Sequence, residues 1–324
     1  MNAQGIKVAL FAPSQSQGLV ITQVLERMKE IADVVIYLDD GALGDEKFYF
    51  RGKRLQPITD SMIKANEYDW VIYAGKAFKF NAFYAQIKDH HVPVLNISWG
   101  QGVESLIGVG NTGKIIQGLN PITQQIKPPL KFIQQHFGIQ SLNLFIGFSV
   151  ETMGEDGLTE LFNQTFAYMS GVNESFYVFP KPIAFNALST VEIDETTDHV
   201  AYKRLLNKEL QHQLDQKLDI ELTLMQMSTL KGHHVVVHVS TEKSIDLKAM
   251  SQYFEHDEEI NHVNMLNNRE CGEYFNQITI GQLAKHPNHE NGLSFHIIAN
   301  EYNYACAKTI KQAYTNLMAS IEKI

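Results

Sequence analysis

The sequence has little cysteine and no long apolar run. Two cysteines in 324 residues, Cys271 and Cys306, are too few for a disulfide framework or a four-cysteine zinc site. No apolar stretch approaches the ~20 residues that a membrane-spanning helix needs. Residues 1–7 lead directly into an expected strand, without the apolar core of a signal peptide. We therefore expect a cytoplasmic protein that has no membrane partner.

Positive charge is also in short supply. The chain carries 27 Lys and Arg against 36 Asp and Glu, which gives a formal net charge of −9. Because binding to a nucleic-acid backbone or a polybasic contact with a membrane needs a basic surface, we expect neither. The 44% of hydrophobic residues is typical of a folded protein, and 324 residues fit two domains of about 150 residues each.

The first third of the chain alternates apolar runs with helical patterns. The runs of strand length are residues 7–12, 34–38, 70–74 and 92–97. Apolar residues at three- and four-residue steps from Val20 to Ile31 predict a helix between the first two runs. Continuous apolar strands between helices indicate a parallel sheet that is covered on both faces. We predict an α/β protein whose residues 1–119 form a Rossmann-like, doubly wound domain of the nucleotide-binding type.

The pattern changes after Gly118. Strand patterns at 142–150, 221–227 and 233–240 occur among longer helices such as 198–216, which indicates an α+β domain with a mostly antiparallel sheet. We assign residues 120–299 to this second domain. The apolar face of residues 306–321 predicts a C-terminal helix, and we expect residues 300–324 to pack back on the first domain.

Six short segments occur in a recognisable order. They are residues 12–18 (APSQSQG), 73–75 (YAG), 94–98 (VLNIS), 130–139 (LKFIQQHFGI), 184–186 (AFN) and 232–233 (GH). Together they resemble the aspartate-semialdehyde dehydrogenase family across almost the whole chain. The resemblance implies a semialdehyde-dehydrogenase-type second domain that forms the subunit interface. It also implies reduction of an acyl phosphate to an aldehyde with NADPH, through a thioester on a cysteine.

The residue that matches the family's nucleophile is a proline. The family has Asn-Cys-Ser/Thr at a helix start, and this chain has Asn120 and Pro121. Proline offers no nucleophilic atom, so no thioester can form there. Pro128 and Pro129 further predict that the helix begins near them or kinks there. His233, which matches the family's general base, and Asn120 are the catalytic positions that remain.

Substrate-binding positions also depart from the family pattern. The family's glutamine partner aligns with Phe148, and its carboxylate-binding arginine aligns with Gln226. A second arginine aligns with Gly102, and the family's Gly-Arg-x-Arg aligns with residues 281–284 (GQLA). A neutral amide in place of a guanidinium gives up a charge-assisted pair worth roughly 1.5–3 kcal/mol per hydrogen bond.

The phosphate-binding turn is degenerate as well. Of the family's three glycines only Gly18 is present, because Ala12 and Gln15 replace the other two. Ser14 and Ser16 could still hold an anion at the helix start, and Gly75 matches a later cofactor-proximal motif. We expect no cofactor, or only weak binding of NADP.

Cysteines and histidines elsewhere carry weaker hypotheses. One hypothesis is that the nucleophile has moved to Cys271. Cys306 lies on the apolar stripe of the last helix and is expected to be buried and inert. The pairs His234/His238 and His286/His289 lack further ligands nearby, so we predict no metal site. The acidic run 255–259 is expected to be a solvated helix start.

The sequence leaves three functions open. The first is a non-catalytic binding or partner protein, a homodimer through its second domain or paired with an active paralogue. The second is an active NAD(P)-dependent oxidoreductase with a rebuilt site, in which His233 works with Glu151 or Asn120. The third is a small-molecule sensor that uses the cleft between the domains.

The dimer hypothesis has support in the strand pattern too. Val235 and Val237 lie on one face of their strand, and Leu222, Leu224 and Gln226 alternate along its expected neighbour. One face of this sheet should pack on helices, and the other should expose an apolar surface that a second copy covers.

Overall fold

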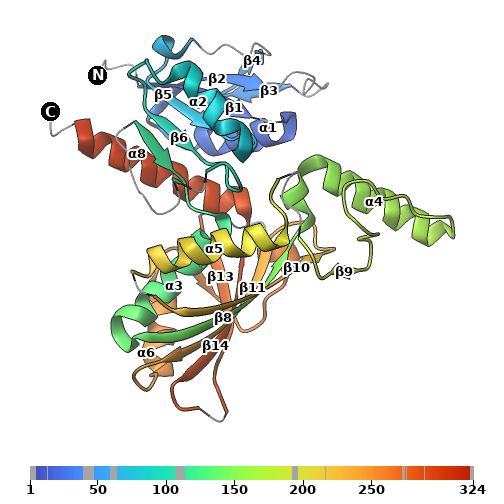
Figure 1. The fold of residues 1–324 in the computed structure, drawn as a ribbon, viewed down its shortest axis with the longest axis vertical. Helices are drawn as coiled ribbons and strands as arrows, with labels where there is room; N and C mark the ends of the chain where they lie inside the picture. The colour runs from blue at the N-terminus through green and yellow to red at the C-terminus, as the bar shows by residue number, and fades with distance from the viewer. Residues whose placement is uncertain are drawn as a thin grey trace. The chain divides into compact units, whose positions relative to one another are not determined.

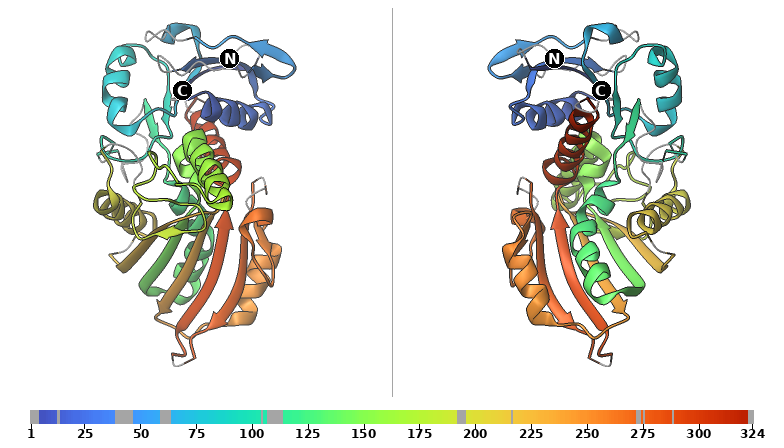
Figure 2. Two further views of the ribbon diagram at one scale, coloured as in Figure 1. Left: turned by 90° about the vertical axis from the view of Figure 1, so that its right-hand side faces the viewer. Right: turned by 90° about the vertical axis from the view of Figure 1, so that its left-hand side faces the viewer.

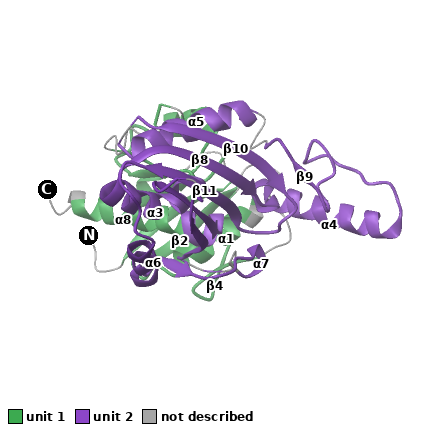
Figure 3. Ribbon diagram, turned by 90° about the horizontal axis from the view of Figure 1, so that it is seen from below, with its two compact units in different colours: residues 1–120, 306–324 green, residues 121–305 purple. Residues whose placement is uncertain are grey.

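The computed structural model describes residues 5–321 except 13, 39–46, 59–63, 104, 107–113, 192–195, 216, 272–273, 275 and 288. The chain divides into two compact units (Figures 1 and 3). Unit 1 comprises residues 1–120 and 306–324, and unit 2 comprises residues 121–305. No helix among the described residues is long and apolar enough to cross a membrane.

Unit 1 is built on a five-stranded parallel sheet. Its strand order is β2-β1-β5-β6-β7. The strands are β1 (Ile6–Ala12), β2 (Ile31–Leu38), β5 (Trp70–Tyr73), β6 (Val94–Asn96) and β7 (Ile115–Gln117). A hairpin of β3 (Phe48–Phe50) and β4 (Lys53–Leu55) lies outside this sheet. All four residues of β5 are buried, as expected for a parallel strand covered on both faces.

Helices of unit 1 pack on this sheet. They are α1 (Gln15–Glu26), α2 (Phe80–Ile87), α8 (Ala307–Ile321) and the short 3₁₀ turns η1 (Ala65–Glu67) and η2 (Ala77–Lys79). Tyr314 of α8 lies against the ring of Trp70 at 6.5 Å, so the C-terminal helix joins the core of unit 1. The order of strands and helices confirms the predicted Rossmann-like architecture.

Unit 2 is built on a seven-stranded mixed sheet of order β12-β13-β14-β11-β8-β10-β9. Four of its six strand pairs are antiparallel, which confirms the predicted α+β class. Its strands are β8 (Ile139–Phe148), β9 (Ala187–Leu188), β10 (Asp219–Met227), β11 (His233–Thr241), β12 (Ile260–His262), β13 (Ile278–Lys285) and β14 (Gly292–Ala299). Its helical elements are α3 (Pro121–Phe137), η3 (Val150–Met153), α4 (Gly154–Ser170), α5 (His199–Gln213), α6 (Leu247–His256), α7 (Asn268–Cys271) and the π-helical turn η4 (Glu301–Cys306).

One face of the unit 2 sheet is covered by α3, α5 and α6. Their contacts fall on β11 and β14, on β10, and on β12 and β13, respectively, and α6 is seen against the strands in Figure 2. Val235, Val237, Leu222 and Leu224 all lie on this covered face and are buried. The expectation that the acidic run 255–259 starts a helix is wrong, because its first two residues end α6 and the rest follow it. The start of α6 is capped by Asp246, which accepts hydrogen bonds from the amides of residues 248 and 249.

The opposite face of this sheet has a mixed character. Phe145, Val236 and Met225 are half-buried there, between the exposed side chains of Asn143 and Thr223. The expectation that the 221–227 strand neighbours the 233–240 strand is wrong: β8 lies between them. The side chains at the centre of this open face therefore come from β8 and β11. The alternation of residues within a single strand could not show which strands are neighbours.

The prediction that the helix at the family's nucleophile position begins near Pro128 is wrong. Helix α3 begins at Pro121 and continues through both Pro128 and Pro129. Each proline lacks the N–H that would bond the carbonyl four residues earlier, at Gln124 and Gln125. The hydroxyl of Tyr304 donates to the Gln124 carbonyl at 3.5 Å and so replaces one of the missing donors.

Candidate functional site

The first residue of α3 has no nucleophilic side chain. Pro121 is the first residue of the helix, directly after the buried Asn120. Proline suits this position, because the first N–H of a helix has no partner within the helix and the fixed φ angle matches helical geometry. The helix start that the resemblance implies for a cysteine is therefore present, but its first residue is a proline, which has no thiol.

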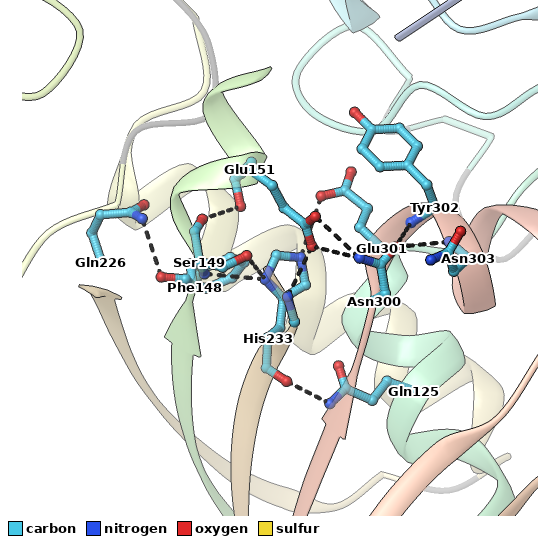
Figure 4. Close-up of polar contacts among 12 residues, drawn as sticks. Gln125, Phe148, Ser149, Glu151, Gln226, His233, Asn300, Glu301, Tyr302 and Asn303 are labelled. Atoms are coloured by element: carbon cyan, nitrogen blue, oxygen red, sulfur yellow. Dashed lines mark hydrogen bonds and ion pairs between the residues drawn. The ribbon is translucent and has the colours of Figure 1, made fainter. Parts of the chain in front are cut away.

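His233 is the first residue of β11, and both nitrogens of its ring contact other groups of the protein (Figure 4). Its side chain is 2% exposed. The backbone N–H of Ser149 donates to Nδ1 at 3.3 Å, and Nε2 lies 3.3 Å from Oε2 of Glu301. Because Nδ1 accepts a hydrogen bond, the neutral ring carries its proton on Nε2 and donates it to the carboxylate. Both ring nitrogens are thus occupied by groups of the protein.

Glu151 is a buried carboxylate beside this histidine. Its oxygens accept hydrogen bonds from the backbone N–H of Gly232 at 3.0 Å and from Nδ2 of Asn300 at 3.1 Å. Burial raises the pKa of Glu151 above its usual range, and the charge of His233 opposes that shift. These hydrogen bonds join the loop before β11 to the residue that follows β14, so Glu151 has a structural role.

The partner of His233 was not foreseen from sequence. Glu301 is 68 residues away, in η4, and no motif marks it. Gln125 was missed too: its Nε2 donates to the carbonyls of His233 and Ile297 at 2.9 and 3.2 Å, and so joins α3 to β11 and β14. Only the tertiary arrangement reveals these contacts, because each pairs residues more than 60 positions apart.

In unit 2, the positions that align with the family's substrate-binding residues make contacts within the fold. Phe148 is buried and packs edge-on against Tyr202, with its ring centroid 5.2 Å from that of His233. Gln226, 2% exposed, donates from Nε2 to the Phe148 carbonyl at 3.1 Å. A hollow beside Gln226 has a volume of about 10 Å³, enough for about one water molecule.

Gly102 in unit 1 leaves no room for a side chain. Its φ angle is +102°, which L-amino acids rarely adopt. A Cβ atom there would lie 2.7 Å from Cα of Phe78 and 2.9 Å from the carbonyl oxygen of Ala77. An arginine at this position would therefore require the backbone of residues 77–78 to move.

In the turn between β1 and α1, Ser14 and Gly18 make close contacts with neighbouring residues of the chain. Ser14 caps α1 by accepting a hydrogen bond from the amide of Gln17 at 3.4 Å, so that amide already has a partner. Gly18 allows close packing, because a Cβ there would lie 3.3 Å from the Phe48 ring and 3.4 Å from Cβ of Ala12. Gln15 and Ser16 are in the first turn of α1, but their side chains are outside the described part of the structure.

Gly75, the remaining position expected at the cofactor site, is covered by a neighbouring tyrosine. A Cβ at this glycine would lie 2.5 Å from the hydroxyl of Tyr73, which donates to the Lys76 carbonyl at 2.9 Å. The ring of Tyr73 also stacks on Phe11 at 5.4 Å. The lack of a side chain at Gly75 therefore leaves room for the side chain of Tyr73.

The other histidines and cysteines form no nucleophilic site among the described residues. Nε2 of His234 lies 3.0 Å from Nδ1 of His296 on the open sheet face. Burial lowers the pKa of both, and for His234 the neighbouring His296 adds to this effect. Cys306 is half-buried at the end of η4 rather than fully buried, and the side chain of Cys271 lies outside the described residues.

Comparison with known proteins gives one consistent answer. No family model matches the chain. Aspartate-semialdehyde dehydrogenase 2 of Vibrio cholerae is 21% identical over 96% of this chain and 97% of its own length. The crystal structure of aspartate semialdehyde dehydrogenase II complexed with ASA, from the same species, superimposes with a TM-score of 0.85 at 20% identity. That match covers 98% of this chain and 99% of that one.

A more distant structure has the same fold with a cofactor. It is aspartate semialdehyde dehydrogenase with NADP from Candida albicans, at a TM-score of 0.68 and 10% identity, over 94% of this chain and 95% of that one. The matched lengths include both units of this chain. In sequence and in fold, the chain is similar to aspartate-semialdehyde dehydrogenases.

Proposed function

We propose that this chain has lost the NADP-dependent acyl-phosphate/aldehyde reaction of its relatives and acts as a binding or partner protein. The observation that carries the proposal is Pro121, which opens α3 where the family's cysteine would stand. Loss of a catalytic nucleophile alone lowers the rate by roughly 10⁶-fold in enzymes where it has been removed. The amide of Gln226 and the closed backbone at Gly102 also offer no cation for a substrate.

The state of His233 supports the same proposal. A general base needs a lone pair that faces the proton it removes. Here Nδ1 accepts from the Ser149 amide, and Nε2 faces Glu301. A histidine with both nitrogens engaged holds two segments of unit 2 together, and it would have to break one contact before it could act on a ligand.

The partner we propose first is a second copy of this chain, joined through the open face of the unit 2 sheet. That face presents Phe145, Val236 and Met225 without a covering helix among the described elements. A twofold axis lets one such face serve both subunits. Pairing with an active relative would use the same face and is the alternative within this proposal.

A second candidate function is an NAD(P)-dependent oxidoreductase with a rebuilt site. The observation that favours it is the pair of His233 with Glu301, since a carboxylate that orients a histidine is a common arrangement in catalysis. Glu301 replaces Glu151 as the expected partner, because the hydrogen bonds of Glu151 go to Gly232 and Asn300.

An activity measurement distinguishes the two functions. Purified full-length chain, aspartate semialdehyde, phosphate and NADP should give no NADPH above the background without protein. Steady NADPH formation that disappears in His233→Asn and persists in Cys306→Ser would overturn the proposal and establish the second candidate. Persistence in both variants would point to a contaminating dehydrogenase, and an active-relative control added to the assay would verify the reagents.

A further inference from the structure

A short segment of unit 2 lies over one end of its sheet. We define the α7 segment as residues 263–271, which follow β12 and include α7. The backbone N–H of Val263 donates to the carbonyl of Ile280 in β13 at 2.9 Å. A Cβ atom at Gly281 would meet the carbonyl oxygen of Val263 and lie 2.5 Å from Cδ1 of Leu266. The lack of a side chain at Gly281 therefore lets the segment approach β13 closely.

Asn268, the first residue of α7, holds the other end of this segment. Its Nδ2 donates to the carbonyl of Gly232 at 2.5 Å. Its side chain also forms a hydrogen bond with His234, and this bond opposes the lowering of the His234 pKa. Such an effect is expected where the amide oxygen accepts an N–H of the ring. The segment is thus fastened to the start of β11 through one asparagine.

His234 and His296 share one proton across their contact. Nε2 of His234 on β11 lies 3.0 Å from Nδ1 of His296 on β14. Because Nδ1 of His234 carries the proton that it donates to Asn268, its Nε2 has a free lone pair, to which Nδ1–H of His296 donates. A first added proton can bind Nε2 of His296 without disturbing this bond. A second must bind Nε2 of His234, where two N–H groups would then face each other.

Burial and neighbouring histidines keep this pair from charging near neutral pH. Burial lowers the pKa of His234, and the nearby His296 lowers it further. Burial also lowers the pKa of His296, together with the exposed His238 on the same face of the sheet. The pair therefore keeps its hydrogen bond at neutral pH and takes up its second proton only in acid.

The described surroundings of the pair add little charge. The charged residues beside it along β11 and in the α7 segment are Lys231, Arg269 and Glu270, and all three are exposed. Glu270 also accepts a hydrogen bond from Nδ2 of Asn267 at 2.8 Å, within the segment. The residues of β8 and β13 that pair with this part of β11 and β14 are uncharged: Phe145, Gly147, Thr279 and Gly281. The protons on the histidines therefore decide the charge beneath the segment.

We propose that the α7 segment is an acid-released cover: when the His234–His296 pair takes up its second proton, the rings separate and the segment leaves the sheet. Two charged rings at this distance repel each other, and they gain water only when the segment has moved. Its release would uncover Ile298 and Thr279, which lie in the same row of the sheet as His234 and are fully buried. This response needs neither catalysis nor a second copy of the chain.

Hydrogen exchange of the full-length wild type tests the proposal at about pH 7.5 and about pH 5, on either side of the ordinary pKa of histidine. Protection factors, which are corrected for the pH dependence of intrinsic exchange, should fall at residues 263–271. Because His234 in the released state titrates at the ordinary pKa of about 6.5, its protonation favours release about 30-fold at about pH 5. The protection of the segment should therefore fall about 30-fold and stay well below that of β8.

Two glutamine variants separate the pair from other histidines. His234→Gln keeps an oxygen that can accept from His296 but cannot take up a proton, so the protection of its segment should change less than about threefold between the two pH values. His238→Gln removes an exposed histidine from the same face and is the matched control. Its segment should respond to pH as the wild type does.

Three outcomes would overturn the proposal. The first is a wild-type segment whose protection changes less than about threefold, and the second is an equal fall in His234→Gln. The third is a segment no less protected than β8 in acid, because its release would then occur only by global unfolding. If His234→Gln fails to hold the segment at either pH, an NMR titration of the wild type still decides: a His234 ring that titrates at or above about pH 6.5 refutes the shared proton.

Discussion

Replacing Glu160 by alanine should detach residues 177–179, in the segment that follows α4, from that helix. The change removes the acceptor of three backbone N–H groups, those of Tyr177, Val178 and Phe179, and also the partner of Nε2 of Gln164. A buried N–H left without an acceptor costs roughly 1–3 kcal/mol. Three such groups would cost about 3–9 kcal/mol if all of them stayed buried, and about 3–6 kcal/mol if water reached some of them. Release of the segment into solvent is the cheaper response, so the damage should remain local.

Hydrogen exchange followed by mass spectrometry measures this directly. A local loss of about 3–6 kcal/mol corresponds to roughly 10²–10⁴-fold faster exchange at the three amides, since 1.36 kcal/mol is a factor of ten. Exchange in β8 and β11 should not change. Glu155→Ala, at an exposed acidic position in the first turn of the same helix, is the matched control. Exchange at residues 177–179 that stays within threefold of the wild type would refute the role given to Glu160.

Three further predictions concern the site and the open sheet face. Pro121→Cys alone should not restore NADPH formation, because Gln226 and Gly102 still provide no cation; turnover in this variant would contradict that reasoning. Calorimetric titration with NADP should show weak or no binding, and a dissociation constant in the low micromolar range would argue for the second candidate function. Burial lowers the pKa of His234 and His296 below 6.5, so the unfolded chain binds protons more tightly than the folded one. The free energy of unfolding should therefore be highest above pH 6.5 and fall as the pH drops from there toward the folded-state pKa values. Urea denaturation of the wild type and of His296→Asn would show this, and equal slopes against pH would refute it.

Sequence reasoning reached the fold because the signals it used are local. Apolar runs such as 70–74 and the stripe that starts at Val20 indicate burial directly, and a strand and a helix occur at these places. The predicted extent of the helix to Ile31 is wrong, because α1 ends at Glu26 and Ile31 begins β2. The start of α3 was misplaced because proline has two effects: it disfavours a helix interior, yet it suits the first position, and the sequence contains both cases in one helix. Local pattern did not decide between them.

The candidate site was predicted only in part, because its contacts join distant segments. His233 was identified through its motif, but its partners Ser149 and Glu301 lie 84 and 68 residues away and follow no spacing rule. The neighbour of β11 was misjudged for the same reason, since strand order depends on the whole sheet. In the sequence, Glu160 is one acidic residue of a helix. Only the structure shows that it is buried and accepts hydrogen bonds from the backbone of residues 177–179.

The backbone at Gly102 limits how this chain could change over time. Because Phe78 and Ala77 fill the space beside it and φ is +102°, a substitution that restores an arginine would be destabilising by itself, whatever it gained in binding. The neighbouring segment would have to shift first, and that shift would bring no benefit until the arginine followed. Mutations at the two places are therefore order-dependent: an arginine at position 102 is tolerated only after the backbone of residues 77–78 has moved.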